Sequence, residues 1–389
     1  MEEIRLGVIG VGGMGTAHAR WLFAGKTAGA RLTALCDTDP NRREQLKKEF
    51  PGLPVYPEAE ELFNAGICDA VIIATPHYGH TAIGIRALKR GLHLLSEKPM
   101  GVRLSDARAL VETAEEQDRT LAVMFNQRTD PLFIKARELT QGGELGELKR
   151  IHWTVTNWYR AQCYYDSGAW RATWRGEGGG VLMNQAPHNL DMWQWICGMP
   201  LRLRALCPVA KYHRIEVEDE ALITGEYENG ATAVFHTSTG EFPGTNRLEI
   251  LGDRGKLVLE EGKLRLWRLA TPERQVCFTA KEPFARIPTT YEEMTFPPVT
   301  DPHGRVLQNF ADHILHGAPL IAPGREALNE VALANAAYLS AWRDGWATLP
   351  PDTAAYDGEL AARCEESALR EGTTAAGHDE YLQRWQVNW

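Results

Sequence analysis

Short apolar runs alternate with amphipathic segments along the first third of the chain. Uninterrupted apolar runs bounded by turn residues are typical of strands buried on both faces of a parallel sheet, whereas apolar residues three and four apart are typical of helices. Strands are predicted over residues 4–9, 31–36, 69–74, 92–96 and 120–125, with helices over 16–23, 80–90 and 105–117. This alternation predicts an α/β fold with a doubly wound parallel sheet.

Beyond residue 150 the pattern changes to strictly alternating apolar and polar positions. Such segments lie within residues 151–158, 201–212, 220–239, 247–251, 256–259 and 263–268. The hairpin signal Glu228-Asn229-Gly230 connects two of them. Helices are predicted over 131–140, 180–197, 306–316 and 327–346. Consecutive strands without intervening helices predict a second, α+β domain with a large, mostly antiparallel open sheet.

The first strand runs directly into a glycine-rich turn, Gly10-Val11-Gly12-Gly13-Met14-Gly15, and then into a helix. In this context Gly10 permits the tight turn, Gly12 lets a pyrophosphate approach the backbone, and Gly15 allows close packing of helix on strand. The next strand ends in Asp37, where the fingerprint places an acid that accepts from ribose hydroxyls. Strand, glycines, helix and acid together favour a dinucleotide site over a purely structural turn.

Lys98 follows a buried strand and precedes a proline. Ligands bind at the carboxyl edge of an open α/β sheet, so this lysine is well placed for chemistry, although a solvated lysine after a strand is the simpler alternative. His77 and His80 follow the neighbouring strand and its Thr75-Pro76 turn. They are expected to flank a nicotinamide ribose, and solvated imidazoles in a helical first turn explain them equally well. Two histidines without a third ligand predict no metal site.

The predicted helix over 180–197 carries a polar stripe. Asn184, His188 and Asp191 fall on one face by i, i+4 and i, i+3 spacing. A satisfied core histidine is the simpler explanation when no cofactor domain precedes the helix. Pro187 removes one backbone hydrogen bond and predicts a kink, which favours a site over plain packing.

Bulk properties exclude several classes of protein. A net charge of −9 and a pI near 5.8 argue against nucleic acid or an anionic membrane surface as the partner. The seven cysteines include no CxxC pair, which is typical of reduced thiols in the cytoplasm. We expect a cytoplasmic protein with neither a signal segment nor a membrane span, because no run of about 18 apolar residues occurs.

These motifs, taken together and in order, resemble the glucose-fructose oxidoreductase/inositol dehydrogenase (Gfo/Idh/MocA) family over residues 4 to 350. The motifs are Gly10-x-Gly12-x-x-Gly15, Ala74-Thr75-Pro76-x-x-x-His80, Glu97-Lys98-Pro99, Trp170-Arg171, and Gly178-Gly179-Gly180 followed by His188 and Asp191. The resemblance implies that Lys98 and His188 form an acid/base pair on a substrate hydroxyl. It also implies that Trp170 and Arg171 lie near the cofactor or substrate, and that subunits pair as a homodimer or homotetramer through the open sheet.

Asn184 departs from the family pattern, since many members carry aspartate at this place. Asparagine can bind a hydroxyl but cannot take a proton, which leaves His188 as the better base. The segment between residues 158 and 174 is rich in aromatic side chains and arginines, as expected for a polyol site. An acidic group on the substrate would also explain the arginines, and so would paired surface arginines.

The sequence therefore predicts an NAD-dependent dehydrogenase of a sugar, glycoside or cyclitol, with NAD preferred over NADP because of Asp37. The alternatives are a redox-neutral lyase or glycosidase that acts through a transient keto-sugar, and a cofactor-binding sensor without catalysis. The predicted domains are a Rossmann domain at 1–128, a substrate and oligomerisation domain at 129–350, and a tail at 351–389 that packs on the body or on a neighbouring subunit. Predicted cofactor-binding residues are Gly10, Gly12, Gly13, Met14, Gly15, Asp37, Thr75, Pro76, His77, His80, Glu97, Lys98 and Trp170. Predicted substrate-binding residues are Asn184, Arg128, Tyr165 and Arg171.

Overall fold

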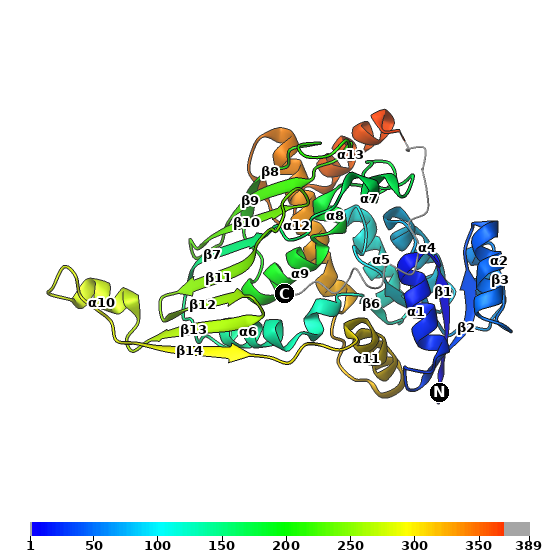
Figure 1. Cartoon of the computed structure of the whole chain (residues 1–389), viewed down its shortest axis with the longest axis horizontal. Helices are drawn as coiled ribbons and strands as arrows, with labels where there is room; N and C mark the ends of the chain where they lie inside the picture. The colour runs from blue at the N-terminus through cyan, green and yellow to red at the C-terminus, as the bar shows by residue number, and fades with distance from the viewer. Residues whose placement is uncertain (1, 369–389) are drawn as a thin grey trace.

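The computed structural model describes residues 2–368, which contain two β-sheets separated by a layer of helices (Figure 1). Part of the predicted tail, residues 369–389, lies outside the described residues. Among residues 2–368, no helix combines the length and the apolar character that crossing a bilayer requires.

The first sheet is entirely parallel and has the strand order β3-β2-β1-β4-β5-β6. Its strands are β1 (Ile4–Ile9), β2 (Ala30–Cys36), β3 (Val55–Tyr56), β4 (Ala70–Ile73), β5 (His93–Ser96) and β6 (Leu121–Val123). Every residue of β4 and of β6 is buried, which explains why these segments are continuously apolar in the sequence. The predicted doubly wound α/β fold is confirmed.

Helices cover both faces of this sheet. They are α1 (Gly13–Phe23), α2 (Pro40–Glu49), α3 (Ala59–Asn64), α4 (His77–Lys89) and α5 (Leu104–Glu116). A later helix, α11 (Pro302–His316), joins them, because its Val306 and Phe310 lie in one apolar cluster with Ile4 and Leu6 of β1. The first sheet is thus completed by residues from far along the chain.

The second sheet has nine strands in the order β14-β13-β12-β11-β7-β10-β9-β8-β15. Its strands are β7 (Leu148–Val155), β8 (Arg202–Leu206), β9 (Glu220–Glu226), β10 (Thr232–Ser238), β11 (Asn246–Gly252), β12 (Gly255–Glu260), β13 (Lys263–Leu269), β14 (Thr289–Thr295) and β15 (Ala347–Thr348). The pairs are antiparallel except for β7 with β10, which is parallel. The sheet is therefore mostly antiparallel, as predicted.

One face of the second sheet packs against helices and the other carries ion pairs. The packed face buries Trp153 and Phe235 with Trp193 of α9 (Pro187–Cys197), and the rings of Phe235 and Trp193 stack 5.6 Å apart. The opposite face holds the cross-strand pairs Arg247–Glu260 and Lys263–Glu293. Helices α6 (Pro131–Gln141), α9 (Pro187–Cys197) and α12 (Gly324–Arg343) lie between the two sheets (Figure 1).

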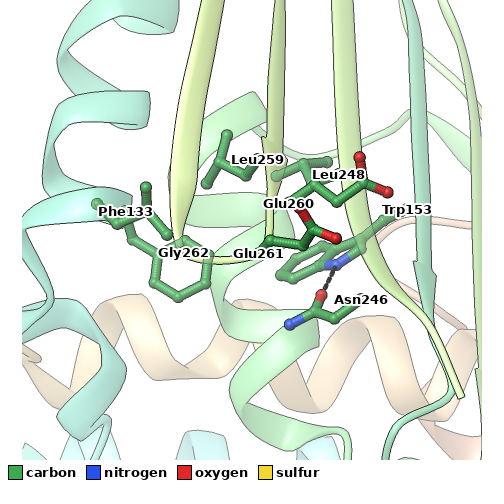
Figure 2. Close-up of a pocket in the computed structure, with 9 residues that line it drawn as sticks. Phe133, Trp153, Asn246, Leu248, Leu259, Glu260, Glu261 and Gly262 are labelled. Carbon is green, nitrogen blue, oxygen red and sulfur yellow. Dashed lines mark hydrogen bonds between the residues drawn. The ribbon is translucent and has the colours of Figure 1, made fainter. Parts of the chain in front are cut away.

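A small cavity lies where α6 meets the end of this sheet. Figure 2 shows the Trp153 indole N–H donating to the Asn246 amide beside Phe133. The cavity measures about 10 Å³, close to the minimum for one water, so it suits packing rather than a ligand. A wider cavity of about 570 Å³ lies between β8, β9, α12 and α13 (Thr353–Glu366). Neither Lys98 nor His188 lines either cavity.

The helix predicted over 180–197 is two helices. α8 (Val181–Asn184) ends before Gln185 and Ala186, and α9 begins at Pro187. Proline lacks the N–H that a continuous helix needs, so it stands in the first turn of a new helix instead of producing a kink. Further elements that the pattern did not predict are β3, α2, α3, α7 (Gln162–Asp166), α10 (Glu273–Thr279), β14, β15, α13 (Thr353–Glu366) and a 3₁₀ turn at Asn126–Thr129.

Candidate active site

Three predicted site segments meet at the carboxyl edge of the first sheet. The strands β1, β4 and β5 are neighbours in that order, and they are followed by Gly10, Thr75 and Lys98 respectively. The chain order reverses between β1 and β4, and in open α/β sheets such a reversal opens a crevice for ligands. The geometry of the sheet therefore brings these segments together.

The glycine-rich turn has the form that a dinucleotide requires. Gly10 has φ 81°, and a Cβ on it would lie 2.7 Å from the Thr75 backbone nitrogen. A Cβ on Gly15 would lie 2.0 Å from the Gly10 carbonyl oxygen, so only glycine allows α1 to start this close to β1. At Gly12, by contrast, a Cβ would meet nothing within 4 Å. The open side of Gly12 at the start of α1 fits a pyrophosphate.

Asp37 lies beside this turn at the end of β2. Its Oδ2 accepts a 2.8 Å hydrogen bond from the Val11 amide, and the carboxylate remains partly exposed. Arg42 donates to the Val11 carbonyl at 2.7 Å, and Arg43 donates to the carbonyls of Asp37 and Thr38. Both arginines are thus engaged with the backbone, while Asp37 keeps acceptor capacity for ribose hydroxyls.

The two histidines after β4 are buried and hydrogen-bonded. His80 lies within hydrogen-bonding distance of the Pro99 carbonyl (2.7 Å) and the Thr75 carbonyl (2.8 Å), so it ties two strand-end loops together. His77 donates from Nδ1 to the Glu177 carbonyl at 2.9 Å. The Trp170 ring packs edge-on against His77 at 5.6 Å. His77 and His80 are therefore not the solvated imidazoles that explained the sequence equally well.

Glu97 and Lys98 face different partners although they are adjacent. Burial alone would raise the pKa of Glu97, but the 2.8 Å hydrogen bond from His18 and the charge of that ring outweigh it and lower the pKa to about 2. Glu97 therefore stays ionised. Lys98 donates from Nζ to the Asn184 carbonyl at 2.8 Å, and burial lowers its pKa while the charges of Glu97 and Glu177 oppose that shift.

The glycine run before α8 is held by a buried carboxyl group. Glu218 accepts from the amides of Gly180 and Leu182 at 3.0–3.1 Å and from the Tyr338 hydroxyl at 2.7 Å. A Cβ on Gly180 would lie 1.8 Å from the Glu218 carbonyl oxygen, so glycine is required there. This arrangement fixes where α8 starts and hence where Asn184 meets Lys98.

His188 lies in the first turn of α9 and is 5% exposed. Burial, and secondarily the charge of Lys98, lowers its pKa well below the usual value, so the imidazole is neutral near pH 7. Its Nδ1 is buried without a hydrogen-bond partner among the described residues. The ring lies 6.1 Å from that of Phe125. A neutral imidazole with an unused nitrogen is able to accept a proton.

Arg128 and Asp191 form a buried ion pair. The guanidinium donates two hydrogen bonds, of 2.8 Å and 2.7 Å, to the carboxylate, and both side chains have 0% exposure. Arg128 also contacts Glu326 and the Ile321 carbonyl. The structure places this predicted substrate residue inside the packing between helices, where it orients α9.

The remaining predicted substrate residues lie on the aromatic segment after β7. Tyr165 shares a 2.7 Å hydrogen bond with Thr239, and its ring lies 4.8 Å from that of His213. Arg171 stacks 4.6 Å above the rings of both Tyr164 and Trp170. Arg171 and Trp170 are thus brought to the His77 side of the site, whereas Tyr165 contacts Thr239 and His213.

Sequence reasoning missed Glu177, a 2%-exposed residue that touches Asn184. It also missed Glu218 and Glu330, which are fully buried. None of these three glutamates belongs to a recognisable sequence motif, so their roles depend on the tertiary structure. Separately, Glu220, His236 and Glu241 bring ligand atoms within 4.8 Å of one another on the second sheet, but Glu220 is already paired with Lys211 at 2.6 Å.

Comparison with known proteins agrees with the fold and the edge geometry. A model described as "Oxidoreductase family, NAD-binding Rossmann fold" matches residues 4–125, and the "GFO/IDH/MocA C-terminal domain" model matches residues 133–258. Between them these models match more than half of the 389 residues. The chain belongs to the Gfo/Idh/MocA oxidoreductase family, as the resemblance implied.

Individual relatives are more distant. An inositol 2-dehydrogenase of Corynebacterium glutamicum is 27% identical over 59% of this chain and 65% of its own length. An uncharacterised oxidoreductase of Escherichia coli is 32% identical over 52% of this chain and 56% of its own length. The chain therefore aligns with less than two thirds of either relative. The WlbA dehydrogenase of Bordetella pertussis, solved with NADH and UDP-GlcNAcA, has a TM-score of 0.75 at 25% identity over 90% of this chain and 100% of its own.

Proposed function

We propose that this protein is an NAD-dependent oxidoreductase that transfers hydride between a secondary hydroxyl of a sugar, glycoside or cyclitol and nicotinamide. The observation that carries the proposal is the 2.8 Å hydrogen bond between Lys98 Nζ and the Asn184 carbonyl. This bond joins the lysine at the cofactor edge to the helix one turn before His188. An ammonium and a neutral imidazole are thereby held near one another in a water-poor site.

The bound nicotinamide supplies the hydride acceptor. The neutral His188 takes the proton of the hydroxyl as the C–H bond breaks with its electron pair and the C=O bond forms. The Lys98 ammonium donates a hydrogen bond to the same oxygen and stabilises its developing negative charge. In the reverse direction, His188 returns the proton to that oxygen.

Carbohydrates and cyclitols are the proposed substrates because the Corynebacterium glutamicum relative is an inositol 2-dehydrogenase and the Bordetella pertussis dehydrogenase was solved with UDP-GlcNAcA. Asn184 supplies hydrogen bonds, and Trp170 with Arg171 supplies a flat cationic surface. Arg128 and Tyr165 are proposed to support the substrate residues through the contacts described above. The glycine turn, Asp37, the Thr75–His80 turn and Glu97 are proposed to hold or border the cofactor, with NAD preferred over NADP.

We further propose that residues 1–128 bind the cofactor and residues 129–350 bind the substrate, with α11 of the second unit packed on the first. A homodimer or homotetramer would form through the ion-paired face of the second sheet, which no described helix covers. A cytoplasmic location is proposed because all seven cysteines are free thiols.

The test is a screen of myo-inositol, scyllo-inositol, hexoses, levoglucosan, glucuronic acid and methyl glycosides with NAD, following absorbance at the NADH band. We expect stoichiometric NADH and a product lighter by two hydrogens in mass spectrometry. A cleaved glycoside without net NADH would overturn the proposal and favour a redox-neutral lyase or glycosidase.

A further inference from the structure

Glu177 places a buried carboxyl group directly against Asn184. One carboxylate oxygen accepts from the Asn184 side-chain amide, and the other accepts from the Ala172 amide at 2.6 Å. Its own backbone carbonyl accepts from His77 at 2.9 Å. Glu177 thus contacts the helix that meets Lys98, the loop that carries Arg171, and the turn after β4.

The charged and titratable groups facing this carboxyl group belong to several elements. Arg171 comes from its own loop and Lys98 from the end of β5, while Tyr165 of α7 also faces it. His77 of α4 contacts its backbone carbonyl. Burial raises the pKa of Glu177, whereas Arg171, the Ala172 amide, Asn184 and Lys98 oppose that rise. Two cations close to a buried carboxylate make ionisation possible at working pH.

An ionised carboxylate only accepts hydrogen bonds, so it must meet the NH₂ end of the Asn184 amide. The Oδ1 end is then turned away from Glu177. We propose that Glu177 is a positioning residue that fixes Asn184 as a hydrogen-bond acceptor toward a hydroxyl of the substrate. This inference rests on the proposed function in that Asn184 contacts the substrate.

Glu177 also fixes the loop that carries Trp170 and Arg171. Ala172 has φ 52°, in the left-handed region that non-glycine residues rarely adopt, and it is fully buried. The hydrogen bond from its amide to Glu177 stabilises this backbone conformation. The same carboxylate therefore sets the orientation of both Asn184 and the aromatic loop.

The inference has a chemical consequence for substitutions. A glutamine at position 177 has one acceptor oxygen and one NH₂ donor. If its oxygen keeps the hydrogen bond from the Ala172 amide, its NH₂ group must face Asn184. The Asn184 amide must then flip and present NH₂ to the substrate. Glu177→Gln is therefore expected to convert Asn184 from acceptor to donor without removing any packing atom.

A stability cycle tests the contact without any substrate. Asn184→Asp places a second carboxyl group against Glu177, so its melting temperature should fall by several degrees more at pH 8.5 than at pH 5.5. Glu177→Gln combined with Asn184→Asp should remove that pH-dependent penalty, because the Gln amide donates to the new carboxylate. If Asn184→Asp lowers the melting temperature by the same pH-dependent amount with Glu or with Gln at position 177, the inference is overturned.

Kinetics test the positioning role in the full-length chain with NAD and the best substrate of the screen. Glu177→Gln should raise KM roughly tenfold with kcat within about twofold, the size expected for one inverted hydrogen bond. In the wild type KM should rise on acidification as Glu177 protonates, and this dependence should vanish in the Gln variant. An unchanged KM, or an equal loss in kcat, would overturn the inference.

Glu216→Gln is the matched control. This carboxylate accepts from a backbone amide and a hydroxyl, those of Ala368 and Ser367, outside the site. The KM of the Glu216→Gln variant, and the dependence of that KM on pH, should match those of the wild type. If the wild-type chain oxidises none of the panel, the proposed function fails, while the stability cycle still decides whether Glu177 and Asn184 interact.

Discussion

Lys98 and Asn184 lie 86 positions apart in the chain, yet the lysine ammonium donates a 2.8 Å hydrogen bond to the asparagine backbone carbonyl. The acceptor is a main-chain atom near the end of α8, so this bond does not depend on the residue type at position 184. The bond fixes the distance between the end of β5, which carries Lys98, and α8, which ends at Asn184. The side chain of Asn184 is left for other partners.

Removal of either member of the proposed acid/base pair should reduce turnover. Lys98→Ala and His188→Ala are each expected to lower kcat by about 10²-fold or more, because the oxygen then loses its charge partner or its proton acceptor. The NAD dissociation constant, measured by fluorescence titration, should change little. Lys135→Ala, an exposed lysine paired with Glu138, serves as the control. Near-wild-type turnover in His188→Ala would mean that another group takes the proton.

Asp37 should determine the choice of cofactor. The wild type is expected to show a higher kcat/KM with NAD than with NADP, since the carboxylate accepts from ribose hydroxyls and repels a 2′-phosphate. Asp37→Ala should weaken NAD binding by roughly tenfold or more. It should also reduce the ratio of kcat/KM with NAD to kcat/KM with NADP. Equal or better kcat/KM with NADP in the wild type would contradict this prediction. It would indicate that Arg42 or Arg43 binds the 2′-phosphate.

Glu218 should make stability depend on pH. Burial raises its pKa from 4.5 to about 7, against the opposing hydrogen bonds from Tyr338, Leu182 and Gly180. The folded protein therefore holds a proton that the unfolded chain releases, so this contribution is complete below about pH 4.5 and is lost as pH rises to about 7. The loss amounts to roughly 3 kcal/mol in the free energy of unfolding.

Denaturant titrations at pH 5, 6, 7 and 8 measure this effect. Glu218→Gln removes the titrating proton, so its free energy of unfolding should fall less than that of the wild type between pH 5 and 7. Glu216→Gln, at a partly exposed position two residues earlier, should follow the wild type. Parallel curves for all three proteins would show that Glu218 is ionised throughout.

The Arg128–Asp191 pair should contribute to stability rather than to substrate affinity. Arg128→Met leaves a carboxylate buried without its cation and is expected to cost about 3–5 kcal/mol. Combining it with Asp191→Leu removes the uncompensated charge and should recover part of that loss. Melting temperatures of the single and double variants give the comparison. A raised KM at unchanged melting temperature would instead support direct substrate contact by Arg128.

The sequence predicted best the elements whose pattern reflects burial alone. Five of the six strands of the first sheet, and Lys98 after one of them, were identified because parallel strands buried on both faces are continuously apolar and end at the ligand edge. The glycine turn was identified by its spacing, and the two-residue strand β3 was missed. Short helices with little apolar pattern, such as α2 with its single buried Leu46, left no such signal.

The site was predicted less completely because its geometry depends on contacts distant in sequence. His188 followed from spacing, but the break before Pro187 separates it from Asn184 by a change of helix. Arg128 was predicted as a substrate residue from the number of arginines around the aromatic segment, whereas its buried pairing with Asp191 depends on a contact between positions 63 apart. Glu177 became recognisable only when the fold placed it against Asn184 and Lys98.

Helix α11 has a consequence for how the chain folds during synthesis. Strand β6 ends at Val123, yet Val306 and Phe310 of α11, which share an apolar cluster with residues of β1, leave the ribosome much later. Until then the apolar surface beneath α11 stays open to solvent. A fragment that stops after the sixth strand would keep that surface exposed and is expected to self-associate. The nucleotide-binding half therefore matures only after most of the other half has been made.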